Sequence, residues 1–193
     1  MPPTPLILAS TSPRRSALLR ELSIPFEVVT AEVTELTPDS APSLTPANLA
    51  AENARRKAQA VSLQRPEAWI LGADTVVVLK GRVFGKPTSL EEAMLFLQAF
   101  SGQKHEVITA CALIEPSNQQ HHFHEVTEVV FKTLSPEIIE RYLAHVHVLD
   151  KAGAYALQEH GEWIVERVDG SRNNVIGLPT ERLVTYFRAA GLL

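Results

Sequence analysis

Apolar runs alternate along the whole chain with segments rich in polar residues, proline or alanine. The apolar run at 6–9 predicts a short buried strand, and the segments 26–30 and 69–79 predict two further strands. An alanine-rich segment at 47–63 predicts a helix, and the Pro-, Ser- and Thr-rich segment 37–46 predicts a loop. Strands that alternate with helices indicate an α/β or mixed α+β protein.

Capping signals mark where several helices begin. The Ser-Pro dipeptides at 12–13 and 135–136 each combine an N-cap serine with a proline at the first helical position. Ser89, with Glu92 three residues later, forms a capping box for a helix that runs to about Phe100. The sequence therefore predicts a helix directly after the first strand.

The second half of the chain continues the alternation. It predicts strands at 106–114, 126–133 and 163–168 and a final helix at 179–190. No repeat or linker divides residues 1–193, so we expect one domain. The polar segment between the first two of these strands is predicted to be a solvated loop, and no zinc-binding pattern accompanies its histidines. These histidines are His121, His122 and His124.

The composition is that of a folded globular domain, with 45% hydrophobic and 21% charged residues. The net charge of −4 repels nucleic acids and anionic membranes, so we expect neither as a partner, and an anionic ligand needs a local positive cluster. No apolar run approaches the ~20 residues of a membrane helix. Without a signal peptide, and with Cys111 as the only cysteine, the chain is expected to be cytoplasmic. Cys111 itself is predicted to be a small buried hydrophobic residue.

The segment LASTSPRR places three hydroxyls and two guanidiniums at the junction of a strand and a helix. Free N–H groups and the positive end of the helix dipole point to the same place, so this junction is a candidate phosphate cradle. Arginine adds paired donors that match two phosphate oxygens. The alternative is a capped helix with two solvated arginines. The candidate phosphate ligands are Ser10, Arg14 and Arg15.

The segment GADTVV places Asp74 inside an otherwise apolar strand, and GKP follows with Lys86. A buried carboxylate is costly unless it is paired, hydrogen-bonded or bound to a metal. Asp74 is therefore a candidate general base or a ligand for Mg²⁺. Across the Lys80-Gly81 turn, Lys86 is placed to return toward Asp74, and a purely structural Asp–Lys pair is the alternative.

Other candidates are less specific. Glu35, its neighbour Glu32 and the helical Lys57 read individually as solvated surface residues. Gln158, in DKAGAYALQ, offers both a donor and an acceptor that suit the edge of a base. GSRNNVIGLP, at 170–179, reads as a loop that leads into the last helix.

Taken together, these segments resemble the Maf family of nucleotide pyrophosphatases over nearly the whole chain. LASTSPRR, GADTVV, GKP, SGQKHEV, DKAGAYALQ and GSRNNVIGLP occur in the family's order. The resemblance implies a mixed α/β fold with a central mixed sheet and a deep cleft between two lobes, usually in a homodimer. It also implies hydrolysis of a nucleoside triphosphate between its α- and β-phosphates, aided by a divalent cation, Mg²⁺ or Mn²⁺.

By position, the resemblance assigns Asp74 as the proton acceptor that activates water and Glu35 as the acid near the metal. Thr34 stands where the family often has another carboxylate, which leaves Glu32 as an alternative to Glu35. Asp74 is a second candidate metal ligand. The residues that resemble the phosphate-binding set are Ser10, Arg14, Arg15, Lys57 and Lys86.

Substrate choice in the family is linked to three positions, which are Arg14, Thr75 and Gln158 here. A glutamine after GAY resembles the branch that acts on dTTP and UTP rather than the 7-methyl-GTP branch, which remains an alternative. The family's IQG is replaced by LQEHG at 157–161, so modified pyrimidine nucleotides are further candidate substrates. Two other functions stay open: a nucleotide-binding regulator of septum formation without turnover, and a phosphatase or kinase with a convergent anion site.

Overall fold

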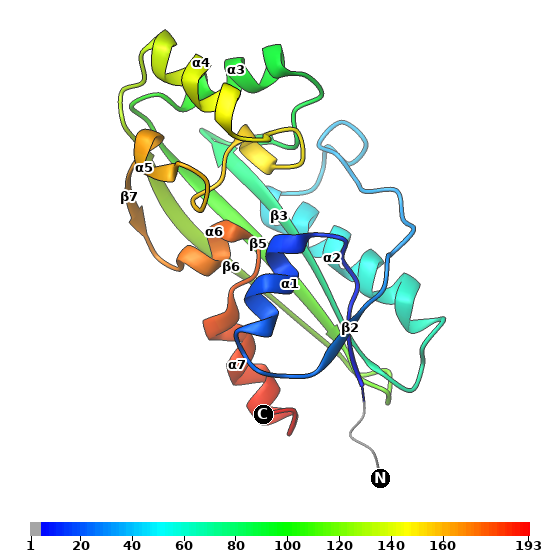
Figure 1. Cartoon of the computed structure of the whole chain (residues 1–193). Helices are drawn as coiled ribbons and strands as arrows, with labels where there is room; N and C mark the ends of the chain where they lie inside the picture. Colours follow the sequence, from blue (N-terminus) through cyan, green and yellow to red (C-terminus); the bar gives the residue numbers. More distant parts are fainter. Residues whose placement is uncertain (1–4) are drawn as a thin grey trace.

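A seven-stranded mixed sheet forms the centre of the computed structural model, which describes residues 5–193 (Figure 1). The strand order is β2-β1-β3-β5-β6-β7, and β4 pairs with β3. The first three strands of this order are parallel, and all other pairs are antiparallel. The predicted mixed α/β class is therefore confirmed. The strands are β1 (Leu6–Leu8), β2 (Phe26–Val28), β3 (Trp69–Leu79), β4 (Arg82–Phe84), β5 (Lys104–Ile114), β6 (Gln120–Phe131) and β7 (Val165–Asp169).

The central strand β3 outruns its neighbour β1. Their pairing ends at Leu8↔Leu71, and β4 joins the same edge of β3 only from Val77. On its other edge, β3 pairs with β5 from Ile70 to Val78. Within the described residues, the stretch 72–76 of β3 thus has a strand neighbour on one side only. An opening at the carboxyl end of a parallel strand is a common place for a ligand site.

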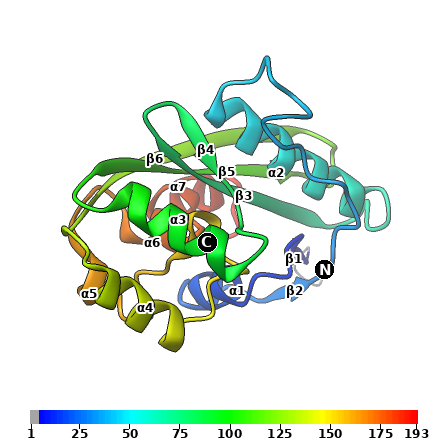
Figure 2. The ribbon, with the colours of Figure 1, turned by 90° about the horizontal axis from the view of Figure 1, so that it is seen from above.

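Helices cover both faces of the sheet (Figure 2). Alanines of α2 pack against β3 and β5 on one face, together with Val76 and Val78. Leucines of α1 and α7 pack against Leu71 and Ala73 on the opposite face. The helices are α1 (Pro13–Arg20), α2 (Pro46–Ser62), α3 (Leu90–Phe100), α4 (Pro136–His145), α5 (Gly161–Ile164), α6 (Arg172–Ile176) and α7 (Thr180–Ala189), with a 3-10 turn, η1, at Ala152–Ala154.

Gly72 allows α2 to approach β3 unusually closely. A Cβ atom at this position would lie 2.3 Å from the carbonyl oxygen of Ala54 and 2.8 Å from the nitrogen of Ala58. Because side chains alternate along a strand, Asp74 points to the same face as Gly72. The close approach therefore brings the polar side chains of α2 within reach of Asp74.

The predicted caps of α1 and α3 are confirmed. Ser12 accepts a hydrogen bond from the Arg15 nitrogen, with proline at the first turn of α1. Ser89 accepts from the Glu92 nitrogen at 3.2 Å. The Glu92 carboxylate accepts from the backbone nitrogen of Thr88, at 2.7 Å, so the capping interaction reaches one residue further back than the capping box predicts.

The prediction of a solvated loop between the second pair of long strands was wrong. β6 begins at Gln120 instead of Val126, and its pairing with β5 continues to the end of the hairpin at Ile114↔Gln120. Backbone hydrogen bonds to β5 hold residues 120–125 in the strand, although Phe123 is the one apolar residue among them. The three histidines named above therefore lie on a strand, opposite Leu113, Ala112 and Ala110.

Three short elements also differ from the sequence prediction. After the confirmed turn, where both Lys80 and Gly81 have positive φ, the chain forms the added strand β4. The segment 163–168 begins in α5 and becomes a strand only at Val165. The predicted loop at 170–179 contains α6, which Ser171 caps by accepting from the Asn174 nitrogen. Elements of three to five residues are too short to show a period in the sequence.

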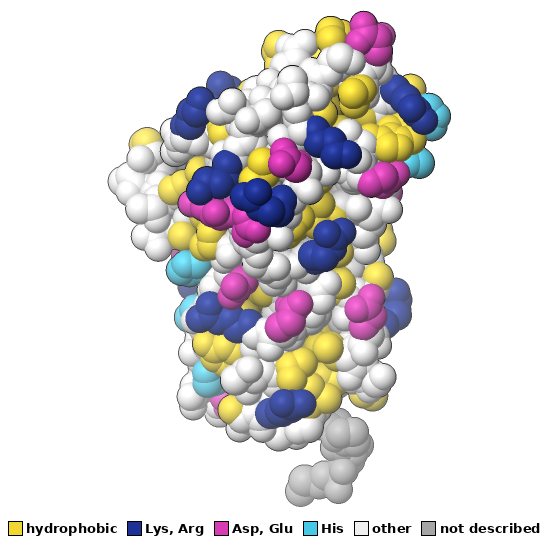
Figure 3. Space-filling model, turned by 90° about the vertical axis from the view of Figure 1, so that its left-hand side faces the viewer, with side chains coloured by type: hydrophobic (Ala, Val, Ile, Leu, Met, Phe, Trp, Pro, Cys, Tyr) yellow, Lys and Arg dark blue, Asp and Glu magenta, His cyan; other side chains and the backbone are white. Residues whose placement is uncertain are grey.

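Cys111 is buried, as predicted, and burial raises the pKa of its thiol to about 12. No helix in the described part of the chain combines the length and the apolar character that crossing a membrane requires. Figure 3 shows one face of the molecule, on which Lys and Arg side chains are interspersed with Asp and Glu.

Candidate active site

A cavity of about 480 Å³ opens beside the unpaired edge of β3. This volume lies within the ~300–1,000 Å³ range of small-molecule sites. Segments far apart in the sequence line it, from the start of α1 to the loop after α6. The structure brings all the candidate residues except Glu32 to this one cavity: Ser10, Arg14, Arg15, Glu35, Lys57, Asp74, Thr75, Lys86 and Gln158.

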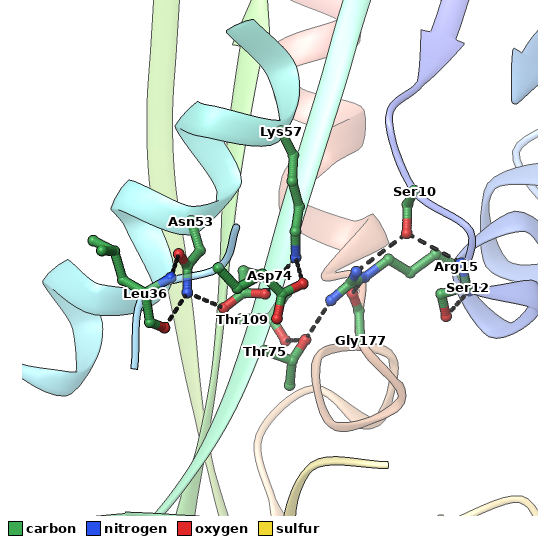
Figure 4. A network of polar contacts seen from close by, with 11 residues as sticks. Ser10, Ser12, Arg15, Leu36, Asn53, Lys57, Asp74, Thr75, Thr109 and Gly177 are labelled. Atoms are coloured by element: carbon green, nitrogen blue, oxygen red, sulfur yellow. Dashed lines mark hydrogen bonds and ion pairs between the residues drawn. The ribbon is translucent and has the colours of Figure 1, made fainter. Parts of the chain in front are cut away.

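Lys57 lies between two carboxylates that line the cavity, Glu35 and Asp74. Figure 4 shows its contact with Asp74. Its ammonium lies 2.7 Å from Asp74 Oδ1 and 2.6 Å from Glu35 Oε1. The Asp74 side chain is 10% exposed, whereas that of Glu35 is 44% exposed. Asp74 is thus a buried carboxylate that is compensated by a buried ammonium. Glu32 is exposed and does not line the cavity, so the structure favours Glu35 as the acid beside Asp74.

Asn53 is part of the site and was missed by the sequence analysis. Its amide nitrogen lies 3.4 Å from Asp74 Oδ2 and donates to the carbonyl oxygen of Leu36 at 3.0 Å, while its amide oxygen accepts from the Leu36 nitrogen. Asn53 therefore ties the segment that carries Glu35 to α2. The signal was present, because residues four apart on a helix, such as Asn53 and Lys57, share one face.

Arg15 braces the opposite side of the cavity (Figure 4). Its guanidinium donates to the hydroxyls of Thr75 and Ser10, at 3.0 and 3.2 Å, and to the carbonyl oxygen of Gly177 at 2.8 Å. Burial lowers the pKa of Arg15, and the negative charge of Asp74 opposes this shift. Since arginine stays protonated in proteins, a full positive charge is held here by neutral oxygens.

Arg14 and Lys86 differ in how far their charges are compensated. Arg14 donates to the Asp150 carboxylate at 2.8 Å and to the Asp150 carbonyl oxygen at 3.2 Å. Lys86 is exposed, and no ion pair within residues 5–193 involves it. The cavity thus gathers positive charge locally on a chain whose net charge is negative.

Glu35 stays ionised in this setting. Burial alone raises the pKa of its carboxyl, but the charge and the hydrogen bond of Lys57, helped by the charge of Lys86, hold it below its usual value. As an ionised carboxylate, Glu35 can bind a metal cation, and the neighbouring ammonium groups of Lys57 and Lys86 can bind phosphates.

Comparison with known proteins identifies the family. The model of the family described as Maf-like protein matches residues 5–190. The chain belongs to the Maf family. It is 42% identical to the dTTP/UTP pyrophosphatase of Akkermansia muciniphila over 187 residues, 97% of both chains. It is 44% identical to the dTTP/UTP pyrophosphatase of Symbiobacterium thermophilum, over 96% of this chain and 94% of that protein.

Solved structures agree with the family's fold. The Staphylococcus aureus Ham1 protein matches with a TM-score of 0.55 at 13% identity, over 97% of this chain and all of that one. A HAM1 protein from Coxiella burnetii matches with a TM-score of 0.51 at 16% identity, over 96% of this chain and 99% of the other. At such low identity the likeness concerns the fold alone.

Two carboxylates of this Maf-family site fit a divalent cation. Glu35 and Asp74 already converge on one positive group, the Lys57 ammonium. Mg²⁺ is usually bound through one or two carboxylates together with substrate phosphates and water. Within the described residues, no three His, Cys, Asp or Glu side chains are grouped to hold a metal, so phosphate and water oxygens would have to complete the ligand set of such an ion.

Proposed function

We propose that this chain is a nucleoside triphosphate pyrophosphatase that hydrolyses dTTP and UTP to the monophosphate and pyrophosphate. The observation that carries the proposal is the convergence of one buried carboxylate, Asp74, and five cationic side chains on a cavity of nucleotide size. The names of relatives more than 40% identical over nearly the whole chain support the choice of nucleotide.

In this proposal Asp74 accepts the proton of the attacking water. Lys57 occupies Oδ1 at 2.7 Å, whereas Oδ2 has only the long contact of 3.4 Å from Asn53. Oδ2 is therefore the oxygen able to take up a proton. The strand fixes the direction of this carboxylate, since its neighbours are paired with β5 on one side and packed against α2 on the face.

The cationic side chains bind and orient the triphosphate. Lys86 is exposed at the cavity and can reach a phosphate without losing an ion pair, and Arg14 lies at the start of α1, where free N–H groups also favour phosphate. Phosphoryl chemistry depends mainly on such positioning and on electrostatic stabilisation. Arg15 keeps the Ser10 and Thr75 hydroxyls in place at the floor of the site.

The site residues also fit Mg²⁺ or Mn²⁺, held by Glu35 and Asp74. When bound, such an ion would neutralise phosphate charge and lower the pKa of water. The residues of this chain orient the α-phosphorus toward the water that Asp74 deprotonates.

Product analysis tests the proposal. Purified protein with excess UTP or dTTP and Mg²⁺ should release pyrophosphate and UMP or dTMP over many turnovers, faster than it does from GTP or 7-methyl-GTP. Release of orthophosphate would indicate a phosphatase, and binding without consumption would indicate a regulator. Preference for 7-methyl-GTP would contradict the choice of substrate.

We also propose that the chain forms a homodimer, as the family resemblance implies, and that it is cytoplasmic, in line with the expectation from the sequence. Leu90 and Leu95 of α3 are 51% and 63% exposed, so apolar surface is available for association. Light scattering after size-exclusion chromatography measures the molar mass against the 21.2 kDa of one chain.

A further inference from the structure

The segment around Gln158 combines a free side chain with a fixed backbone. Gln158 is exposed and lines the cavity, and within residues 5–193 its amide makes no hydrogen bond. Two residues before it, the Tyr142 hydroxyl lies 3.0 Å from the Ala156 nitrogen and 3.3 Å from the Ala156 oxygen. The Tyr142 hydroxyl thus fixes the backbone two residues before Gln158, while the side-chain amide of Gln158 stays free to contact a ligand.

On the other side, Glu159 is held by a buried ammonium. Glu159 Oε1 lies 3.2 Å from Lys151 Nζ, and the Lys151 side chain is only 5% exposed. The same ammonium lies 2.9 Å from Asp150 Oδ1 and donates to the carbonyl oxygen of His147. The Glu159 side chain itself is 43% exposed, so its carboxylate faces solvent on one side and the buried ammonium, which needs compensation, on the other.

This ion pair continues to the phosphate cradle. Asp150 bonds to Lys151 through Oδ1 and to Arg14 through Oδ2. Four alternating charges therefore run from Glu159, next to Gln158, through Lys151 and Asp150 to Arg14 at the start of α1. This chain of ion pairs links the segment that carries Gln158 to the opposite wall of the cavity.

His160, the residue after Glu159, stacks on Trp163. Its ring lies 4.1 Å from the Trp163 ring at an interplanar angle of 20°, and the Arg141 guanidinium lies 4.0 Å from the same indole. The backbone of His160 has a φ of 53°, in the left-handed region that few non-glycine residues adopt. The residues Glu159 and His160, which extend the usual family pattern, are thus both anchored.

We propose that Glu159 is a positioning residue that, through Lys151, holds Gln158 in place to select the base of the nucleotide. This inference rests on the proposed function. Glu159 does not line the cavity, and its negative charge would repel a triphosphate, so a direct contact with substrate is disfavoured. Its effect must therefore pass through its neighbours.

The first test is Glu159→Gln, which keeps the size of the side chain and removes its charge. KM for UTP should rise about 5- to 20-fold while kcat changes less than about twofold, because a base contact contributes to binding rather than to the reacting atoms. The preference for UTP over GTP, as a ratio of kcat/KM values, should fall by a similar factor. Glu166→Gln is the matched control, since Glu166 is an exposed carboxylate on β7 that forms no ion pair within residues 5–193 and does not line the cavity.

A double-mutant cycle with Gln158→Ala gives the decisive readout. If Glu159 acts through Gln158, Glu159→Gln adds little to the KM of the Gln158→Ala variant, so the two effects are strongly non-additive. Additive effects, an unchanged KM, or a loss of kcat together with a large fall in melting temperature would each overturn the proposal. If the wild-type protein releases no pyrophosphate from UTP, the proposed function fails first, and the two failures are distinguished.

Discussion

Replacement of Asp74 by asparagine is the sharpest perturbation of the proposed chemistry. The amide has nearly the same shape but cannot accept a proton. Loss of a general base lowers turnover about 10²- to 10⁴-fold, which corresponds to roughly 3–5 kcal/mol in the activation barrier. The effect should appear in kcat, because Asp74 acts on the water and the cationic groups still bind the nucleotide.

The cost in stability should be modest by comparison. Removing one partner of a buried ion pair costs ~3–5 kcal/mol when the other charge is left alone. Here Lys57 keeps Glu35 at 2.6 Å, and the asparagine oxygen can still face the ammonium. We therefore expect a loss of about 1–2 kcal/mol, which lowers the melting temperature by only a few degrees in a protein of this size.

The assay is pyrophosphate release from saturating UTP, with thermal unfolding measured on the same preparations. Asp169→Asn is the control, because Asp169 is a 43% exposed carboxylate on β7 that pairs with Arg167 and does not line the cavity. A folded Asp74→Asn variant that keeps turnover within about threefold of the wild type would remove Asp74 from the proton transfer.

Four further outcomes are expected. Gly72→Ala should lower the free energy of unfolding, measured by urea denaturation, by about 3 kcal/mol or more, because the alanine Cβ would lie 2.3 Å from the Ala54 oxygen. Gly85→Ala is the control and should change this free energy little, because the space around a Cβ at position 85 is open. Burial lowers the pKa of His105 to about 4, so the folded state holds fewer protons than the unfolded chain between pH 6.5 and 4. The free energy of unfolding should fall by about 3 kcal/mol across that window in the wild type and less in His105→Gln. Below pH 4.5 the depressed pKa of Glu35 acts in the same direction, so Glu35→Gln should flatten the remaining slope. Treatment with EDTA should abolish pyrophosphate release, and added Mg²⁺ or Mn²⁺ should restore it.

The parts of the fold that carry a clear period or a local cap could be predicted from the sequence. The buried strand β3, the alanine-rich α2 and the serine cap of α1 follow from patterns that each span fewer than 20 residues. The start of β6 could not be predicted in this way. Its first residues form a strand because β5 is long enough to pair with them. The polar sequence QHHFH gives no sign of this partner, because pairing depends on a different segment of the chain.

The same distinction applies to the site. Asp74 could be singled out because a carboxylate in an apolar strand is costly and needs a partner. Its partners could not be derived locally, because Lys57 and Asn53 reach it only through the close approach of α2 at Gly72. The bond between Arg14 and Asp150 joins positions 136 residues apart, and only the folded chain brings them together.

The cationic groups of the cavity differ in what they must give up to bind a triphosphate. Lys86 has no ion pair within the described residues, and Arg15 is held by neutral oxygens, so both can attract phosphate without separating charges. Lys57 and Arg14 are already paired with carboxylates, and either must leave a negative partner behind when it turns toward phosphate. For Arg14 the buried Lys151 still compensates Asp150. For Lys57 no second protein cation contacts Glu35 and Asp74 in residues 5–193. When Lys57 turns toward the triphosphate, a divalent cation can compensate the two carboxylates that it leaves. We therefore expect the divalent cation and the triphosphate to bind cooperatively.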